Sequence, residues 1–402
     1  MKRSLEVADL FRAFGPAYRE AHQMPLRHHR VMRAIEICRT AELGGHLDQC
    51  DHCAAVRISY NSCRNRHCPK CQSLEKERWL EAREKDLLPI PYFHVVFTFP
   101  EGLRPLALRN QKVLYNLLFK AVSETLTELA RDSKHLGAEI GFMAILHTWS
   151  QTLIDHPHLH CLVTGGGLSL DGKRWIASRK DFFIPVQVLS SLFRRKFLDG
   201  LKKEYESGGL KFPGQIEELK EASAFKRFLT NLYHQEWVTY CRPSLKNPEK
   251  VMDYLGRYTH RVALSNDRLV KLEDNQVTFR WRDSADNNKI KLLTLEAFEF
   301  IRRFLLHVLP EQFVKIRYYG ILSHRSRKTK LSRCKKLLGV LIPEKSKEVL
   351  KETWQDLLTR MTGIDLSLCP YCGKGKMIQI EILPAYSISL EDKRFPCAGC
   401  PP

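Results

Sequence analysis

The sequence predicts an α+β protein with a cysteine-rich segment near each end, and three observations support this prediction. Runs rich in β-branched and aromatic residues are typical of strands, and they lie at 92–99, 138–150, 158–163 and 268–294. Apolar residues recur at helical spacing in other segments, at about 1–45, 104–134, 187–235 and 295–308. Finally, pairs of cysteines separated by two residues occur only towards the two ends of the chain.

The first half of the chain begins with helices. Apolar residues at helical spacing include Leu10, Phe11, Phe14, Tyr18, Val31 and Ile35. A polar stretch rich in Cys and His follows at 46–71, and then a charged helix at 73–80. The run 92–99 is dense in β-branched and aromatic residues and ends at Pro100, so we expect a buried strand. Residues 104–134 predict one or two helices.

In the second half, 138–150 and 158–163 are expected to be neighbouring strands. A basic helical region spans about 187–235, and Pro243 and Pro248 bracket a linker into the helix that carries Tyr254 and Tyr258. Residues 268–294 predict a strand meander. From Arg317 the chain is strongly basic and ends in the second cysteine-rich segment. We therefore expect three domains, at 1–85, 86–310 and 311–402.

Charge and composition narrow the class of partner. The 402 residues carry a formal net charge of +20, which favours a polyanionic partner, most commonly nucleic acid. The N-terminus has no apolar signal region, and no run approaches the roughly 18 apolar residues of a membrane helix. We expect a cytoplasmic protein with no membrane partner. Its thirteen cysteines then favour metal binding over disulfides.

Two cysteine pairs in the N-terminal segment predict a structural zinc site. Cys50 and Cys53 form one pair, and Cys68 and Cys71 form the other. Each such turn offers two thiolates to one ion, so the two turns together would complete a tetrahedral four-cysteine site. Spare ligands lie nearby and would replace a named cysteine or bind a second ion: Cys63, His67 and His46.

The C-terminal segment has a similar pattern. Cys369 and Cys372 form one pair, and Cys397 and Cys400 form the other. Their spacing is compatible with a zinc ribbon, which would hold a second zinc ion.

His158 and His160 are the candidate ligands of a catalytic metal. Successive side chains on a strand point to opposite faces, so the two imidazoles share one face and can bind a divalent ion. Such a site needs one further ligand from the protein, and we expect it from the adjacent strand. Gln151 is the preferred candidate and His147 the alternative. A pair of solvated or core histidines is the simpler interpretation of the same pattern.

Tyr254 and Tyr258 are the candidate nucleophiles. Positions i and i+4 of a helix are neighbours, so both phenols would lie on one face. An aromatic pair at this spacing more often belongs to a core, but here Asp253, Gly256 and Arg257 make the face mixed. Arg257 could also clamp a phosphate oxygen.

The chain resembles the HUH endonuclease superfamily, named for its His-hydrophobic-His motif, and more closely the rolling-circle transposases of the insertion sequence 91 family. The motifs that carry this resemblance are 65–71 (Asn-Arg-His-Cys-Pro-Lys-Cys), 146–149, 158–163, 254–262 and 317–322.

The resemblance implies a central antiparallel sheet with helices packed on it, the metal histidines on a middle strand and the tyrosines on a facing helix. It assigns His158 and His160 as ligands of Mg²⁺ or Mn²⁺, and Tyr254 and Tyr258 as nucleophiles. Related initiators often have Lys where this chain has Arg257, which keeps the charge and changes the geometry.

Together these motifs predict a DNA transposase that nicks and joins single-stranded DNA through a 5′-phosphotyrosine. Its partners would be single-stranded and hairpin element ends and the target DNA, and binding would place it on the nucleoid. One alternative is a plasmid rolling-circle replication initiator or relaxase with the same chemistry. Two others are a zinc-containing DNA-binding regulator without catalysis and a metal hydrolase that uses the histidine pair.

Overall fold

The computed structural model describes residues 4–179, 183–245, 248–258 and 262–340, followed by 356, 359–360, 363, 365 and 367–385. Within these ranges, the side chains at 73–75, 243–245, 248–249 and 257–258 are not described.

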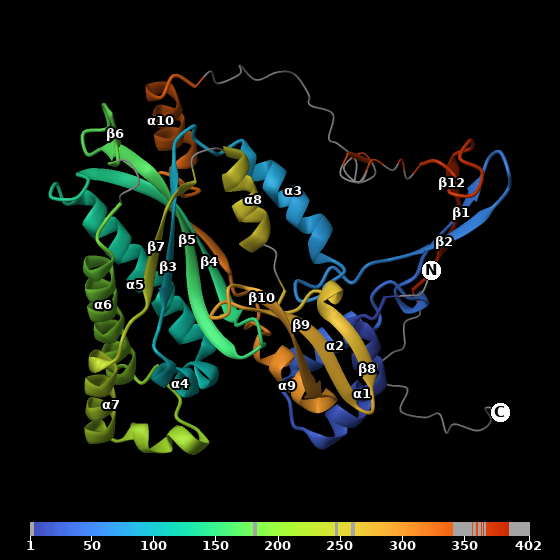
Figure 1. Cartoon of the computed structure of the whole chain (residues 1–402), viewed down its shortest axis with the longest axis horizontal. Coiled ribbons are helices and arrows are strands. Elements are labelled where there is room, and N and C mark those ends of the chain that lie inside the picture. The colour runs from blue at the N-terminus through green and yellow to red at the C-terminus, as the bar shows by residue number, and fades with distance from the viewer. Residues whose placement is uncertain are drawn as a thin grey trace.

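A six-stranded antiparallel sheet forms the centre of the protein, as the sequence predicts (Figure 1). Its strand order is β11-β4-β5-β3-β7, and β6 pairs with the end of β5. The strands are β3 (Tyr92–Thr98), β4 (Ala138–Trp149), β5 (Asp155–Ser169), β6 (Trp175–Ala177), β7 (Thr239–Leu245) and β11 (Ile316–Gly320). The expected linker at Pro243 belongs in fact to β7, which lies at one edge of the sheet, where a proline is tolerated.

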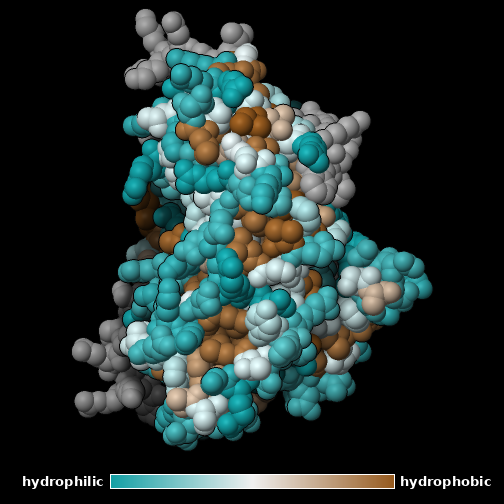
Figure 2. All heavy atoms as spheres, turned by 90° about the vertical axis from the view of Figure 1, so that its left-hand side faces the viewer, coloured by the Kyte–Doolittle hydropathy of each residue, from teal (hydrophilic) through white to brown (hydrophobic). Residues whose placement is uncertain are grey.

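One face of the sheet packs against a layer of helices and forms the largest core. The helices in this part of the chain are α4 (Arg104–Arg109), α5 (Gln111–Arg131), α6 (Val186–Glu206) and α7 (Ala222–His234). Alternate residues of β3 (Phe93, Val95 and Phe97) are buried in this core. Burying one such side chain stabilises the fold by about 1.5–3 kcal/mol. The apolar residues therefore hold the strand in one orientation, and the residues between them point to the opposite face of the sheet. Figure 2 views the molecule from the helical side, where hydrophilic side chains surround several apolar patches.

The opposite face of the sheet carries shorter helices. They are α3 (Gln72–Glu84), α8 (Pro248–Tyr258) and α10 (Ser332–Leu337). Val251 and Leu255 of α8 belong to a second core together with Ile145 and Leu162 of the sheet. The helix predicted to carry the tyrosines is therefore confirmed, and it lies against the sheet face that carries the histidines.

The N-terminal helices pack against a separate three-stranded sheet. Helices α1 (Val7–Ala21) and α2 (Leu26–Glu36) share a core with β8 (Leu269–Glu273), β9 (Gln276–Asp283), β10 (Lys289–Glu296) and α9 (Ala297–Leu306). For example, the ring centroids of Phe11 and Phe304 are 5.3 Å apart. Segments on either side of the expected boundary at 85/86 thus pack together, and the meander predicted at 268–294 is confirmed.

A segment from the N-terminal part of the chain also meets one from the C-terminal part. Strands β1 (Gly45–Cys50) and β2 (Val56–Tyr60) form a hairpin, and β12 (Met377–Leu383) pairs with β1 in an antiparallel ladder. In Figure 1 this small sheet projects to one side of the body of the protein. Part of the expected C-terminal domain, 311–402, thus pairs with the N-terminal segment, and β11 from the same domain belongs to the central sheet.

The close pairing of β11 with β4 makes Gly320 a sensitive position. Its φ is +57°, and an added Cβ would lie 1.9 Å from the carbonyl oxygen of Ile140. Gly172 has a φ of +71°, and an added Cβ there would meet nothing within 4 Å. We expect Gly172→Ala to lower the free energy of unfolding by about 1 kcal/mol, the strain of a positive φ, and Gly320→Ala by at least about 2 kcal/mol more. Urea unfolding of both variants measures this difference, and equal losses would contradict the packing at β11.

Candidate active site

Three histidines meet on the sheet face opposite the large core. His158 and His160 lie on β5, and His147 on β4 pairs directly with His158. One ring nitrogen from each of the three lies within 4.8 Å of the other two. We call these residues the histidine group. The sequence-predicted pair therefore does share a face, and the neighbouring strand supplies a third imidazole.

The contacts of these imidazoles suit a metal site. His158 Nδ1 lies 2.6 Å from the backbone oxygen of His156, so this nitrogen carries the proton and donates it, which leaves the Nε2 lone pair available. The Nε2 atoms of His158 and His160 are 3.1 Å apart. Two nitrogens that bind one ion at about 2.0–2.1 Å lie about 3.0–3.4 Å apart, so the spacing fits a shared ion.

The structure replaces Gln151 with His147 as the candidate third ligand. Gln151 lies in the exposed turn beyond the end of β4, where its backbone oxygen accepts a hydrogen bond from Arg268 at 2.5 Å. His147 is still within the strand, and the antiparallel register sets it opposite His158. The sequence favoured Gln151 because its spacing from His158 suited a neighbouring strand. The sequence does not show that β4 ends at Trp149, before Gln151.

His94 is a member of the site that the sequence interpretation missed. It lies on β3, and its Nε2 is 2.9 Å from His160 Nδ1, on the side of that ring away from the histidine group. Such a contact orients a ligand imidazole. Burial lowers the pKa of both His94 and His158 to about 4, so both rings are neutral near pH 7. The signal in the sequence was a histidine within an otherwise apolar strand.

Tyr254 approaches this constellation from α8. Its side chain is 4% exposed, and its ring centroid lies 4.6 Å from that of His94. At Gly256, α8 lies close to α3, and a Cβ at this position would be 3.4 Å from Leu80, an ordinary van der Waals contact. The side chains of Arg257 and Tyr258 lie outside the described residues, so their predicted roles stay predictions.

A basic cavity of about 530 Å³ opens beside the histidine group. Its lining includes four cationic and two indole side chains, Lys76, Arg268, Arg280, Arg282, Trp149 and Trp281. Gly256, in the last turn of α8, and Gln151 also border it. Trp149 stacks on His147, with ring centroids 4.8 Å apart and planes inclined by 18°. The cavity and the histidine group are therefore in contact through this pair of rings.

The cysteines are grouped differently from the expectation. Cys68 and Cys71 meet Cys38 and Cys63, the first cysteine group, and Cys50 and Cys53 meet Cys369 and Cys372, the second cysteine group. The predicted grouping of Cys50 and Cys53 with Cys68 and Cys71 is wrong because the β1–β2 hairpin carries its tip away from the start of α3 (Figure 1). Cys397 and Cys400 lie outside the described residues.

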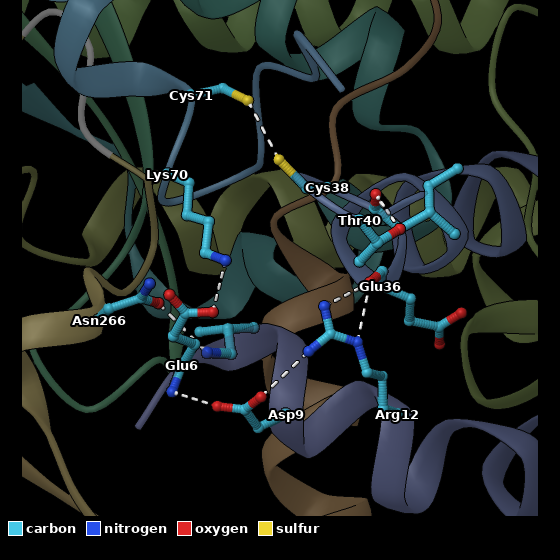
Figure 3. A network of polar contacts seen from close by, with 11 residues as sticks. Glu6, Asp9, Arg12, Glu36, Cys38, Thr40, Lys70, Cys71 and Asn266 are labelled. Atoms are coloured by element: carbon cyan, nitrogen blue, oxygen red, sulfur yellow. Dashed lines mark hydrogen bonds and ion pairs between the residues drawn. The ribbon is translucent and has the colours of Figure 1, made fainter. Parts of the chain in front are cut away.

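The first cysteine group packs against the N-terminal helices. Cys71 Sγ lies 3.6 Å from the Sγ atoms of both Cys38 and Cys63. Thiolates bound tetrahedrally to zinc at about 2.3 Å are about 3.8 Å apart, so the spacing fits one ion. Figure 3 shows Cys38 and Cys71 of this group beside a polar network in which Lys70 pairs with Glu6 at 2.6 Å. Of the spare ligands, Cys63 joins the group, whereas His46 Nε2 lies 3.6 Å from Asp48.

Comparisons with known proteins agree with this geometry. A family model described as "Transposase zinc-binding domain" matches residues 10–99, and one described as "Putative transposase" matches residues 141–330. A Sinorhizobium fredii protein named "Putative transposase y4qJ" is 53% identical over 94% of this chain and 95% of its own length. The chain belongs to the insertion sequence 91 family of transposases.

A second relative of this transposase is the transposase for insertion sequence element IS801 of Pseudomonas savastanoi pv. phaseolicola. It is 29% identical over 72% of this chain and 68% of its own length. No solved structure matches the chain. Membership of the family makes DNA the substrate and transposition the activity, and the zinc-binding domain with its cysteine groups supports structural zinc. Among the described residues, no helix has the length and apolar character that crossing a bilayer requires.

His307, which lies against Trp149 of the active site, makes the stability of the transposase depend on pH. It is fully buried, donates from Nε2 to the oxygen of Leu153, and has its pKa lowered to about 4 by burial. Between about pH 6.5 and pH 4 the unfolded chain therefore binds a proton that the folded chain does not, so folding weakens as the pH falls.

We expect His307→Gln to lose less stability than the wild type between pH 7 and pH 5, because one such group is removed. The exposed His234→Gln variant is the control and should follow the wild type. Urea unfolding at both pH values gives the comparison. Parallel losses in all three proteins would show that His307 is charged in the folded state.

Proposed function

We propose that this transposase nicks and joins single-stranded DNA at insertion-sequence ends through a 5′-phosphotyrosine intermediate, by a rolling-circle mechanism. One observation carries the proposal. The ring of Tyr254 contacts His94, and His94 is within hydrogen-bond distance of His160 in the histidine group. The candidate nucleophile on α8 and the three imidazoles of the histidine group therefore lie close together, which supports the proposal.

His147, His158 and His160 would hold the Mg²⁺ or Mn²⁺ ion through neutral ring nitrogens. When bound, the ion polarises the scissile phosphate and helps orient it for in-line attack. His94 is a positioning residue, because its contact with Nδ1 keeps Nε2 of His160 directed at the group.

The covalent step exchanges one phosphodiester for another. The phenolic oxygen of Tyr254 bonds to phosphorus, and the bond from phosphorus to the 3′ oxygen breaks. The phenol loses its proton and the departing 3′ oxygen gains one, so the products are a 5′-phosphotyrosine and a free 3′-hydroxyl. Because the number of phosphodiester-type bonds is unchanged, no nucleotide cofactor is needed. The reverse reaction, with a different 3′-hydroxyl, joins the strand to the target.

Arg257 and Tyr258 would complete this chemistry. They follow Gly256 on α8, and Gly256 borders the basic cavity. An arginine there would clamp a phosphate oxygen. A second tyrosine would permit a second strand exchange in the same site, so that one end is released as the next is joined.

The basic cavity suits the bound DNA strand. Phosphates favour the cationic side chains of Lys76, Arg268, Arg280 and Arg282, and Trp149 and Trp281 offer faces for stacking unpaired bases. Bases stack in this way only when they are unpaired, which favours single-stranded and hairpin ends over continuous duplex. The net charge of +20 supports the wider, salt-dependent contact with element ends and target DNA.

The experiment that tests the proposal is incubation of the full chain with labelled single-stranded DNA from its own element ends, with and without Mg²⁺ or Mn²⁺. We expect a metal-dependent, protease-sensitive covalent adduct on a denaturing gel. Tyr254→Phe should abolish the adduct of the first nick, because phenylalanine keeps the ring and removes the attacking oxygen. His158→Ala should reduce it by at least about a hundredfold, because a metal ligand is lost.

Two further variants show which tyrosine the adduct depends on. Tyr258→Phe tests whether the second tyrosine is needed for the first nick or only for joining. Tyr240→Phe removes the hydroxyl of an exposed tyrosine on β7 and should leave the adduct unchanged. Binding of the correct ends without any adduct would overturn the proposal and favour a regulator without catalysis.

The positioning role of His94 gives a separate prediction. We expect His94→Leu to raise the Mn²⁺ concentration for half-maximal nicking by about 10–100-fold, the usual cost of losing a partner of a ligand imidazole. His94→Gln should restore part of the affinity, because its amide can reach the same nitrogen. Circular dichroism checks that both variants fold. Unchanged metal dependence in both would show that His94 only fills space.

A further inference from the structure

The second cysteine group joins the N-terminal hairpin to the segment that leads into β12. Cys50 and Cys53 come from the tip of the β1–β2 hairpin, and Cys369 and Cys372 from the turn before β12. Cys50 Sγ lies 3.7 Å from Cys372 Sγ, and Cys53 Sγ lies 3.6 Å from Cys369 Sγ. We propose that these four cysteines bind a second structural zinc ion, which fastens the C-terminal segment to the N-terminal hairpin.

The distances between the thiols match a four-cysteine zinc site. All four Sγ atoms lie within 4.8 Å of one another, and the two closest contacts across the group approach the roughly 3.8 Å that tetrahedral zinc imposes. Each of the four is a free thiol in the structure. If the cysteines only contacted each other as two independent pairs, their four sulfur atoms would not need to converge on one point. A single ion bound by all four requires this convergence.

The backbone around the thiols supports the same assignment. The N–H groups of His52 and Cys53 point to Cys50 Sγ, each at 3.4 Å, and that of Gly375 points to Cys372 Sγ at 3.4 Å. Such donors stabilise negative charge on sulfur, which a zinc-bound thiolate carries. Gly375 also permits the close approach of the two turns, because an added Cβ there would lie 2.5 Å from Cys50 Sγ.

The small sheet needs such a cross-link because it buries little apolar surface. On β2, Val56 and Ile58 are 46% and 50% exposed, and on β12, Ile380 and Ile382 are 52% and 73% exposed. Three strands without a buried face are marginally stable in water, and small modules of this kind commonly depend on a metal. The ladder between β1 and β12 and the contact of Lys376 N–H with Asp51 Oδ1, at 2.7 Å, then form around the ion.

This site is distinct from the chemistry proposed above, and only Cys50 and Cys53 of its four cysteines lie within the matched zinc-binding domain. The two family models end at residues 99 and 330, so Cys369 and Cys372 lie beyond both. The first cysteine group holds α2 to the start of α3, whereas the second joins segments from opposite ends of the chain. Two zinc ions per chain are expected, each with its own structural task.

Zinc content and hydrogen exchange of the purified full chain test the proposal. We expect two zinc ions per wild-type chain by elemental mass spectrometry. The double variant Cys369→Ser with Cys372→Ser should retain one, and its amide exchange should rise in β12 and β1. Exchange in α1, α2 and the central sheet should be unchanged, because those segments do not contact the second cysteine group. The matched control, Cys241→Ser, alters a cysteine on β7 and should retain two ions.

The complementary double variant Cys38→Ser with Cys63→Ser should also lose one ion, with exchange rising in α1 and α2. If that protein does not fold, the wild type and the first variant still decide the question. A wild-type content of one ion, unchanged by Cys369→Ser with Cys372→Ser, would overturn the proposal. So would a cross-link among these four cysteines that is lost under reducing conditions in a metal-free protein.

Discussion

The antiparallel register between β4 and β5 is the constraint on which the active site depends. It sets His147 opposite His158 and turns His158 and His160 to the same side. A shift of one residue would reverse every side chain of one strand, which would expose apolar residues and bury imidazoles in the large core. The apolar residues on the other face, such as Leu159 and Cys161, hold this register because they are fully buried. The core on one side of the sheet thus fixes the geometry on the other.

Around this sheet, the electrostatic environment changes over a short distance. Burial lowers the pKa of His158 to about 4, so this ring is neutral near pH 7 and keeps a nitrogen lone pair for a cation. The adjoining cavity carries several fixed positive charges on Lys76, Arg268 and their neighbours, which suit an anionic strand. Trp149 lies between these two environments, stacked on His147. Under the proposed function, a phosphate held by the cavity would therefore lie beside the histidine group that would bind the metal ion.

The transposase also uses its cysteines in an arrangement that crosses the order of the sequence. The pair Cys50 and Cys53 and the pair Cys68 and Cys71 belong to different groups, because the β1–β2 hairpin separates the two pairs in space. Cys38, at the end of α2, and Cys63 complete one group, while β12 returns from the far end of the chain to complete the other. The N-terminal helices also share a core with α9. The strand β12 is thereby joined to the N-terminal hairpin, and the N-terminal helices to α9.

The sequence by itself determined the α+β class, the strands predicted at 92–99, 138–150, 158–163 and 268–294, the helix that carries Tyr254 and the shared face of His158 and His160. These follow from local periodicity, which short stretches of chain encode. Tertiary structure alone decided that His147 rather than Gln151 joins them, that His94 lies behind His160, and how the cysteines are grouped. Each of these depends on where a strand ends or which distant strand pairs with it. Such long-range pairing is set by the packing of the whole chain, and residue spacing does not record it.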